Sequence, residues 1–181
     1  MCIRDRDKGE VIIDGFNVSK ASRRQLYKFR RRLGFVFQGS ALFDSLSVFW
    51  NVALPLAEAG RKPEEIRELV AEALRLVGLE GTENLYPAEL SGGMRKRVGV
   101  ARAIVAKPEV LFYDEPTAGL DPVTADAIGD LILSLKRELG TTSVVVTHDL
   151  HLAVKVSDRI ALLKGGVVAW EGSVGDLREV D

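Results

Sequence analysis

Two adjacent carboxylates stand where they could hold a metal ion and activate water. Asp114 and Glu115 directly follow Val110–Tyr113, an apolar run with β-branched and aromatic residues that is typical of a strand buried on both faces. Ligands of open α/β sheets lie just beyond the carboxyl ends of strands. An aspartate there can hold Mg²⁺ on nucleotide phosphates, and the next glutamate can deprotonate an attacking water. An ordinary acidic turn is the alternative explanation of this pair alone.

Three other polar positions mark the ends of predicted elements. Gln38 follows the predicted strand Gly34–Phe37, and His148 follows the apolar run Ser143–Thr147, which we expect to be another buried strand. Ser91-Gly92-Gly93 precedes a basic helix that extends to about residue 106. Each has a structural explanation, because serine is a preferred N-cap residue and a turn can hold a histidine or glutamine. Together they outline a site at the carboxyl edge of a sheet.

The elements that carry these residues alternate between strands and helices. A short strand is predicted over 10–15 and a hairpin over 160–170, with a terminal helix from about 174 to 179. Ser22, with Gln25 three residues later, predicts a capped helix start. This alternation predicts an α/β fold with a mainly parallel sheet.

An inserted helical segment interrupts that core. Pro63 begins a strongly amphipathic helix that Gly78 ends, and the residues on either side of it are also predicted to be helical and apolar. We therefore expect one domain over 1–181, with the α/β core in 8–42 and 106–181 and the helical subdomain in 43–105. The charged segment 1–7 shows no period and is excluded from the core. The apolar surface of the insertion could also bind a partner.

Composition excludes several classes of protein. The chain has 181 residues, a net charge of −1 and a single cysteine, Cys2. The charge gives no argument for nucleic-acid binding, and one cysteine excludes an internal disulfide. No apolar run approaches the roughly 20 residues of a membrane helix. We expect any role at a membrane to be mediated by a partner.

The motifs in this order resemble the nucleotide-binding subunit of an ABC transporter. The resemblance rests on Leu90-Ser91-Gly92-Gly93-Met94, Tyr113-Asp114-Glu115-Pro116-Thr117, Gly119-Leu120-Asp121-Pro122 and Thr147-His148-Asp149. It implies a P-loop NTPase-like fold that binds ATP and Mg²⁺. It also implies a homodimer, or pairing with a second ATPase subunit, on membrane-embedded permease subunits at the cytoplasmic face of the inner membrane.

The resemblance also assigns roles by position. Glu115 resembles the catalytic base and His148 the switch histidine on the γ-phosphate, whereas Asp114 resembles the magnesium ligand. Gln38 resembles the glutamine that contacts the metal. Ser91, Gly92 and Gly93 resemble the signature loop that binds ATP of the opposite subunit, and Asp121 resembles an interface aspartate.

One part of the family pattern is missing from these 181 residues. Phosphate binding in the family uses a loop of the form Gly-x-x-x-x-Gly-Lys-Ser/Thr, and neither Gly-Lys-Ser nor Gly-Lys-Thr occurs here. We expect an amino-terminally truncated copy, inactive alone. A protein that naturally has no P-loop is the alternative.

The transported substrate is predicted from a narrower resemblance. Residues 38–48 and Met94 of the signature are similar to ATPases of bacterial lipid-asymmetry transporters, which favours phospholipid transport. An importer of amino acids or another small solute is the alternative, and so is a non-hydrolysing fragment that supplies only its signature loop. A chromosome-repair ATPase would need a long coiled coil between Gln38 and Ser91, and the sequence has none.

Overall fold

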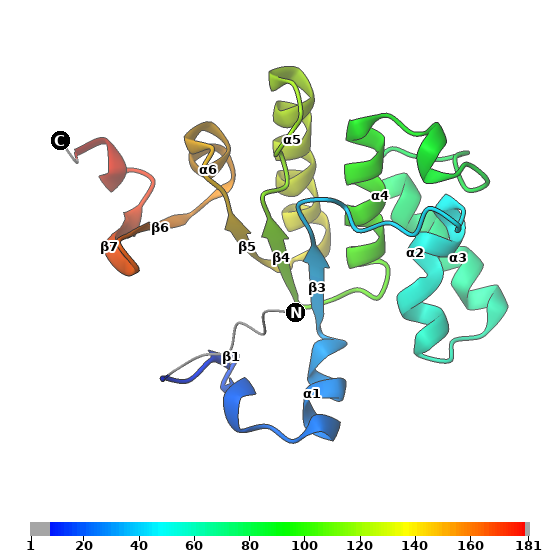
Figure 1. Cartoon of the computed structure of the whole chain (residues 1–181), viewed down its shortest axis with the longest axis horizontal. Coiled ribbons are helices and arrows are strands. Elements are labelled where there is room, and N and C mark those ends of the chain that lie inside the picture. Colours follow the sequence, from blue (N-terminus) through cyan, green and yellow to red (C-terminus); the bar gives the residue numbers. More distant parts are fainter. Residues whose placement is uncertain (1–7, 180–181) are drawn as a thin grey trace.

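A three-stranded parallel sheet forms the centre of the molecule (Figure 1). The computed structural model describes residues 8–179. Strands β3 (Leu33–Val36), β4 (Val110–Asp114) and β5 (Thr142–Val146) lie in the order β3-β4-β5, and both pairs are parallel. The predicted mainly parallel α/β fold is therefore confirmed. The segment 1–7 lies outside the described residues.

Helices and two small hairpins make up most of the other described elements. The helices are α1 (Arg23–Arg30), α2 (Val48–Glu58), α3 (Pro63–Leu76), α4 (Gly92–Ile104), α5 (Pro122–Leu139) and α6 (Leu150–Val156). The hairpins pair β1 (Ile12–Ile13) with β2 (Phe16–Asn17) and β6 (Arg159–Lys164) with β7 (Val167–Ser173). Short 3₁₀ turns cover Val18–Lys20, Pro87–Glu89 and Asp176–Glu179. The last of these replaces the terminal helix expected from about residue 174, and the strand expected over 10–15 is only two residues long.

The predicted starts of α1 and α3 and the predicted end of α3 are confirmed. Ser22 and Gln25 form a reciprocal capping box, in which the Ser22 N–H donates to Gln25 Oε1 at 2.9 Å. Pro63 occupies the first turn of α3, where a missing N–H has no cost. Gly78 follows that helix with a φ of 68°, a conformation that glycine adopts without strain.

Helices α2, α3 and α4 pack against one another, and α4 also contacts β3 and α5. The contact with β3 is very close. A Cβ atom on Gly34 would lie 2.5 Å from the main-chain oxygen of Ala103 and 2.6 Å from Leu111 Cδ2. Only glycine therefore allows β3 to lie this near to α4, the helix that follows Ser91.

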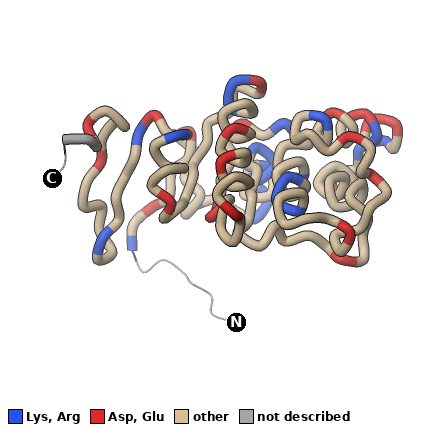
Figure 2. The backbone as a smooth tube through the Cα atoms, turned by 90° about the horizontal axis from the view of Figure 1, so that it is seen from above, with Lys and Arg blue, Asp and Glu red and all other residues tan. Residues whose placement is uncertain are grey.

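Charge is mixed over the molecule. Figure 2 shows acidic and basic residues interspersed along its length, including the end formed by α2 and α3 and the opposite end formed by β6 and β7. No helix within residues 8–179 is long and apolar enough to cross a membrane.

The two faces of the sheet differ sharply in burial. Leu111 and Tyr113 are 0% and 1% exposed and belong to the same apolar cluster as the helices. On the other face, Phe35, Phe112 and Val144 lie in register across the three strands. Phe35 is 44% exposed and Val144 is 42% exposed. No element within residues 8–179 buries this second face.

The prediction that β5 is a buried strand is therefore wrong, and the prediction that β4 is buried on both faces holds for one face only. The run Ser143–Thr147 is not a buried strand, since the burial of β5 alternates and Val146 is 56% exposed. The run Val110–Tyr113 is fully buried on one face and only partly on the other. An apolar run identifies a strand, but it does not show how many of its faces are covered.

Self-association through β5 is the expected consequence. Within the described part of the chain, β5 pairs only with β4, so its other edge exposes main-chain donors and acceptors beside Val144 and Val146. We expect Val144→Lys to lower the weight-average mass measured by sedimentation velocity. Val154→Lys, which changes an exposed valine of α6 instead, should leave it unchanged. A monodisperse wild-type monomer at tens of micromolar would contradict this expectation.

Candidate functional site

The carboxyl ends of the three parallel strands meet at one edge of the sheet, where the polar positions follow (Figure 1). Gln38 comes two residues after β3, Asp114 is the last residue of β4, and His148 comes two residues after β5. Because the strands are parallel and adjacent, these positions share an edge. The location expected from the sequence is observed.

Glu115 and His148 form a direct polar contact across this edge. The imidazole Nδ1 of His148 lies 2.9 Å from Glu115 Oε1. The carboxylate side chain is 20% exposed, whereas the imidazole is 83% exposed. The other carboxylate oxygen, Oε2, is buried and has no hydrogen-bond partner in the described structure. A carboxylate at this edge of the sheet has the chemistry of a general base.

The backbone of Glu115 is strained at this point. Its φ is 47°, a left-handed conformation that is uncommon for residues other than glycine. Its N–H donates to the main-chain oxygen of Val146 at 2.9 Å, which extends the pairing of β4 with β5 by one bond. Strain of this kind is retained where surrounding contacts over-determine it. The carboxylate of this strained residue is the one that contacts His148.

The pH dependence of this contact can be measured. The hydrogen bond and the charge of Glu115 raise the pKa of His148 above its ordinary value of 6.5. The contribution of the pair to stability is therefore full below pH 6.5 and is lost as the pH rises through the higher folded-state pKa. We expect an NMR titration of His148 to show this raised pKa and Glu115→Gln to reverse most of the shift. His151→Gln leaves a single histidine signal and so provides the assignment. An unchanged His148 titration in Glu115→Gln would contradict the assignment of this contact.

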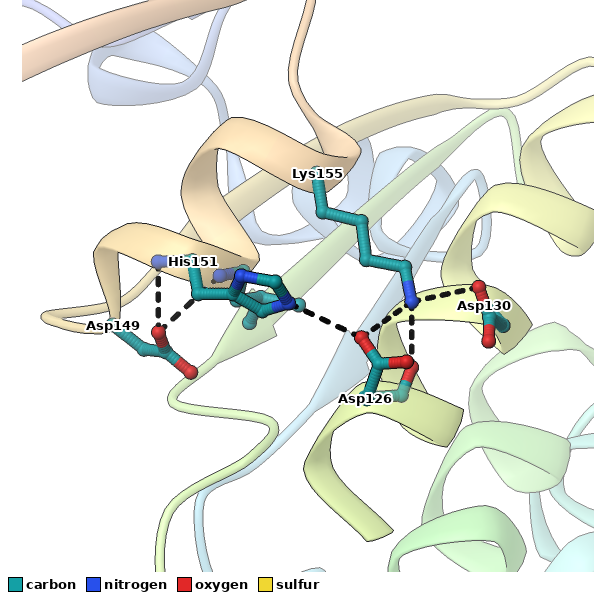
Figure 3. A network of polar contacts seen from close by, with 6 residues as sticks. Asp126, Asp130, Asp149, His151 and Lys155 are labelled. Atoms are coloured by element: carbon teal, nitrogen blue, oxygen red, sulfur yellow. Dashed lines mark hydrogen bonds and ion pairs between the residues drawn. The ribbon is translucent and has the colours of Figure 1, made fainter. Parts of the chain in front are cut away.

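A network of charged side chains holds the helix that follows His148 (Figure 3). Lys155 on α6 binds Asp126 at 2.6 Å and Asp130 at 2.7 Å, both on α5. His151 lies 3.2 Å from the same Asp126, and Asp149 caps α6 by accepting from its first amides. These contacts fix α6 against α5 and thus fix the position of His148 just before it.

Asp114 and Gln38 are the residues that could hold a magnesium ion. Both are exposed at the carboxyl edge, and carboxylate and amide oxygens are the donors that Mg²⁺ accepts. Within residues 8–179 no three acidic, histidine or cysteine side chains form a complete metal cage. This arrangement fits Mg²⁺, which is usually held by one or two protein ligands together with water and phosphate oxygens.

Ser91, Gly92 and Gly93 form the start of α4. Ser91 is the N-cap and its hydroxyl accepts from the Met94 N–H at 3.2 Å. The following glycines leave the amides of the first turn accessible, and Ser91 and Gly92 are exposed. A helix start with free amides favours an anion.

Asp121 lies close to this loop, on the neighbouring helix. A Cβ on Gly93 would lie 2.7 Å from Thr124 Cγ2, and Asp121 accepts from the Thr124 hydroxyl at 2.5 Å. Asp121 also caps α5 by accepting from the main-chain amides of Val123 and Thr124. These bonds, the Thr124 hydroxyl first, hold the pKa of Asp121 below its ordinary value. Its observed contacts are therefore those of a helix cap.

Lys96 also lies among the site residues, although no motif of the sequence marks it. Its side chain is only 7% exposed, and its ammonium donates to the main-chain oxygen of Gln38. The same ammonium lies 3.5 Å from the main-chain oxygen of Glu115. The available signal was spacing, because Lys96 falls on the helix face of Val100 and Ala103, which are buried.

Comparison with known proteins identifies the family. Residues 2–118 match the family described as "ABC transporter". The methionine import ATP-binding protein of Burkholderia thailandensis is 46% identical over 170 residues, and that of Carboxydothermus hydrogenoformans is 43% identical over 169. These matches cover 94% and 93% of this chain but only 49% and 50% of the relatives. The chain thus spans about half the length of those proteins.

Solved structures of ATP-binding cassettes share the fold. A dimeric structure of the cassette MJ0796 bound to ADP and Pi has a TM-score of 0.82 at 39% identity and covers 93% of this chain and 74% of that one. The structure of cbiO1 from Clostridium perfringens, part of an ABC transporter complex, has a TM-score of 0.87 at 32% identity. It covers 96% of this chain and 69% of that one. The chain therefore belongs to the ABC transporter family and has the fold of its ATP-binding cassettes.

Proposed function

We propose that this chain is the ATP-binding and ATP-hydrolysing subunit of an ABC importer for an amino acid or a similar small solute. The observation that carries the enzymatic part is the pair Glu115–His148, 2.9 Å apart at the carboxyl edge of the sheet. The carboxylate of Glu115, whose side chain is 20% exposed at this edge, can accept the proton of an attacking water. The family membership of the chain supports ATP as the nucleotide.

The solute is inferred from the relatives. Methionine import proteins between 40% and 46% identical over more than nine tenths of the chain favour the amino-acid importer over phospholipid transport. The similarity of residues 38–48 and Met94 to lipid-asymmetry ATPases concerns a loop and one helix start. Neither segment would touch a solute that crosses the membrane through another subunit.

Each residue at the edge has a distinct role in this proposal. Asp114 and Gln38 would hold Mg²⁺, which would supply positive charge to offset that of the ATP phosphates. Glu115 takes a proton from water. His148, whose imidazole is largely exposed beside Glu115, donates to the γ-phosphate. Protonation of His148 favours this contact because it adds a charge to the donor.

We propose that the exposed start of α4 acts on the nucleotide of the opposite subunit. Ser91, Gly92 and Gly93 bind the γ-phosphate of ATP held by a partner ATPase subunit, and Asp121 lies at that interface. We also propose that the chain binds membrane-embedded permease subunits at the cytoplasmic face of the membrane. No nucleic-acid partner is proposed. The half-exposed Phe43 and Trp50 give the helical segment an apolar surface suited to a protein partner.

The missing Gly-x-x-x-x-Gly-Lys-Ser/Thr loop limits what these 181 residues do alone. That loop supplies the backbone amides and the lysine that hold the phosphates. We therefore propose that these 181 residues by themselves bind ATP too weakly to measure, and that hydrolysis at their own site needs such a loop. Beside an intact partner subunit they would still supply the signature loop. Residues 8–181 preceded by the P-loop segment of an ABC ATPase, hereafter the P-loop chimera, would supply both halves of the site.

Uptake in a bacterial strain that lacks its methionine import ATPase tests the proposed solute. The P-loop chimera, expressed in this strain, is expected to restore uptake of labelled methionine. A matched chimera with Glu115→Gln should fail. Hydrolysis of ATP by a purified chimera that restores no uptake would reject the methionine assignment. Repair of detergent sensitivity in a strain without its lipid-asymmetry ATPase would favour phospholipid transport instead.

A further inference from the structure

The loop that follows β3 crosses one face of α4. Three residues of that helix, spaced by three, contact the loop: Lys96, Gly99 and Arg102. A Cβ on Gly99 would lie 3.4 Å from both the Cβ and the main-chain oxygen of Ser40. The loop therefore lies directly on the helix at Gly99, with a cationic side chain on either side.

The main chain of this loop is strained where it lies on the helix. Ser40 and Ala41 have φ values of 59° and 46°, and neither is a glycine. Two successive left-handed residues of this type are uncommon and persist only when other contacts hold them. Ser40 is also 4% exposed, so its main-chain oxygen requires a partner inside the protein.

The two cations supply those partners. The Arg102 guanidinium donates to the main-chain oxygen of Ser40 at 2.7 Å and to that of Ala41 at 2.6 Å. The Lys96 ammonium donates to the main-chain oxygen of Gln38 and lies 3.5 Å from that of Glu115. Hydrogen bonds from charged donors are the stronger kind. Together they hold the main chain at Gln38, Ser40 and Ala41.

Packing alone does not explain why a lysine is buried at position 96. Its side chain is 7% exposed and its hydrogen bonds run to carbonyl groups. Burial lowers the pKa of Lys96, and the negative charge of Glu115 opposes this effect. A buried cation is costly unless its geometry is well satisfied, so an apolar residue would serve packing better.

We propose that Lys96 and Arg102 are positioning residues that clamp residues 38–41 to α4. Resting on the proposed function, the clamp places Gln38 and Glu115 relative to Ser91 at the start of the same helix. One helix thus carries the loop that serves the opposite subunit and fixes the residues that serve the chain's own nucleotide. Displacement of α4 at the interface would move Gln38 with it.

Hydrogen exchange of the 181-residue chain, followed by mass spectrometry, tests the clamp without ATP. The reporting peptide covers 38–42, where the Ser40 amide donates to Phe37 at 2.9 Å. The reference peptide covers 43–51, which the buried Asn51 anchors by four hydrogen bonds. We expect Lys96→Met and Arg102→Met to speed exchange of the reporting peptide by about tenfold or more while the reference peptide is unchanged.

Two further variants separate the clamp from general destabilisation. Arg97→Met removes a cation of the same helix that donates to the main-chain oxygen of Val77 at 2.8 Å, and it should leave the reporting peptide unchanged. Arg102→Lys keeps a donor for one of the two carbonyls and should restore most of the protection. Equal acceleration of both peptides in Lys96→Met, or no acceleration, would overturn the clamp.

Turnover of the P-loop chimera tests whether the clamp acts through Gln38. Lys96→Met should slow ATP hydrolysis in the chimera but add little to the effect of Gln38→Ala, because residues that act through one another are not additive. If the double variant loses turnover by the product of the two single fold-decreases, the positioning role is overturned. A chimera that binds ATP but hydrolyses none would instead reject the proposed function, and the exchange experiment would still decide the clamp.

Discussion

ATP turnover by a mixed dimer of this chain and the P-loop chimera is expected to fall about 10²-fold or more when Ser91 of this chain becomes arginine. The dimer contains a single P-loop, in the chimera, and this chain completes that site with its exposed helix start at Ser91. A bulky cation there would occupy the seat of the γ-phosphate. Glu115→Gln in the same chain should change nothing, because the chain's own carboxylate has no nucleotide to act on.

The measurement uses dimers purified through two different affinity tags. Ser22→Arg is the matched control, since it removes a serine cap from α1 instead of α4. Turnover should survive that substitution. Equal sensitivity to Ser91→Arg and Glu115→Gln would mean that the two halves of the site are wrongly divided.

In the chimera homodimer, Glu115→Gln is expected to slow ATP hydrolysis by about 10²-fold or more with ATP binding retained. An amide keeps the shape of the side chain and its contact with His148, but it cannot take a proton from water. Calorimetry measures binding and phosphate release measures turnover. Glu65→Gln changes a partly exposed carboxylate of α3 that pairs with Arg61, and it should behave as wild type. Wild-type turnover in Glu115→Gln would reject the role of base.

Much of the site follows from local pattern and one rule of topology. Asp114 and His148 each come at the end of an apolar run, and parallel strands bring such ends to one edge. The starts of α1, α3 and α4 were equally readable, because Ser22, Pro63 and Ser91 act on the next few residues. Interactions within four residues leave a signature in the sequence.

What could not be predicted depends on distant partners. Lys96 bonds to main-chain oxygens 58 and 19 positions away, and every residue type offers the same carbonyl, so no motif marks the contact. Ser40 and Ala41 have left-handed backbone although neither is a glycine, so the sequence gives no sign of this conformation. The exposure of Val144 depends on what covers the second face of the sheet. These features are tertiary and were found only in the structure.

Strands β3 and β4 pair in the folded protein but are synthesised at different times. Arg32, just before β3, bonds to Glu109, just before β4, and the two are 77 positions apart in the chain. At roughly 5–20 residues per second, the ribosome makes β3 several seconds before its partner exists. Helices α2 to α4 can pack meanwhile through nearer contacts. During that interval Phe35 and its neighbours lie on an unpaired strand, which makes the nascent chain a natural client for chaperones that bind short apolar segments.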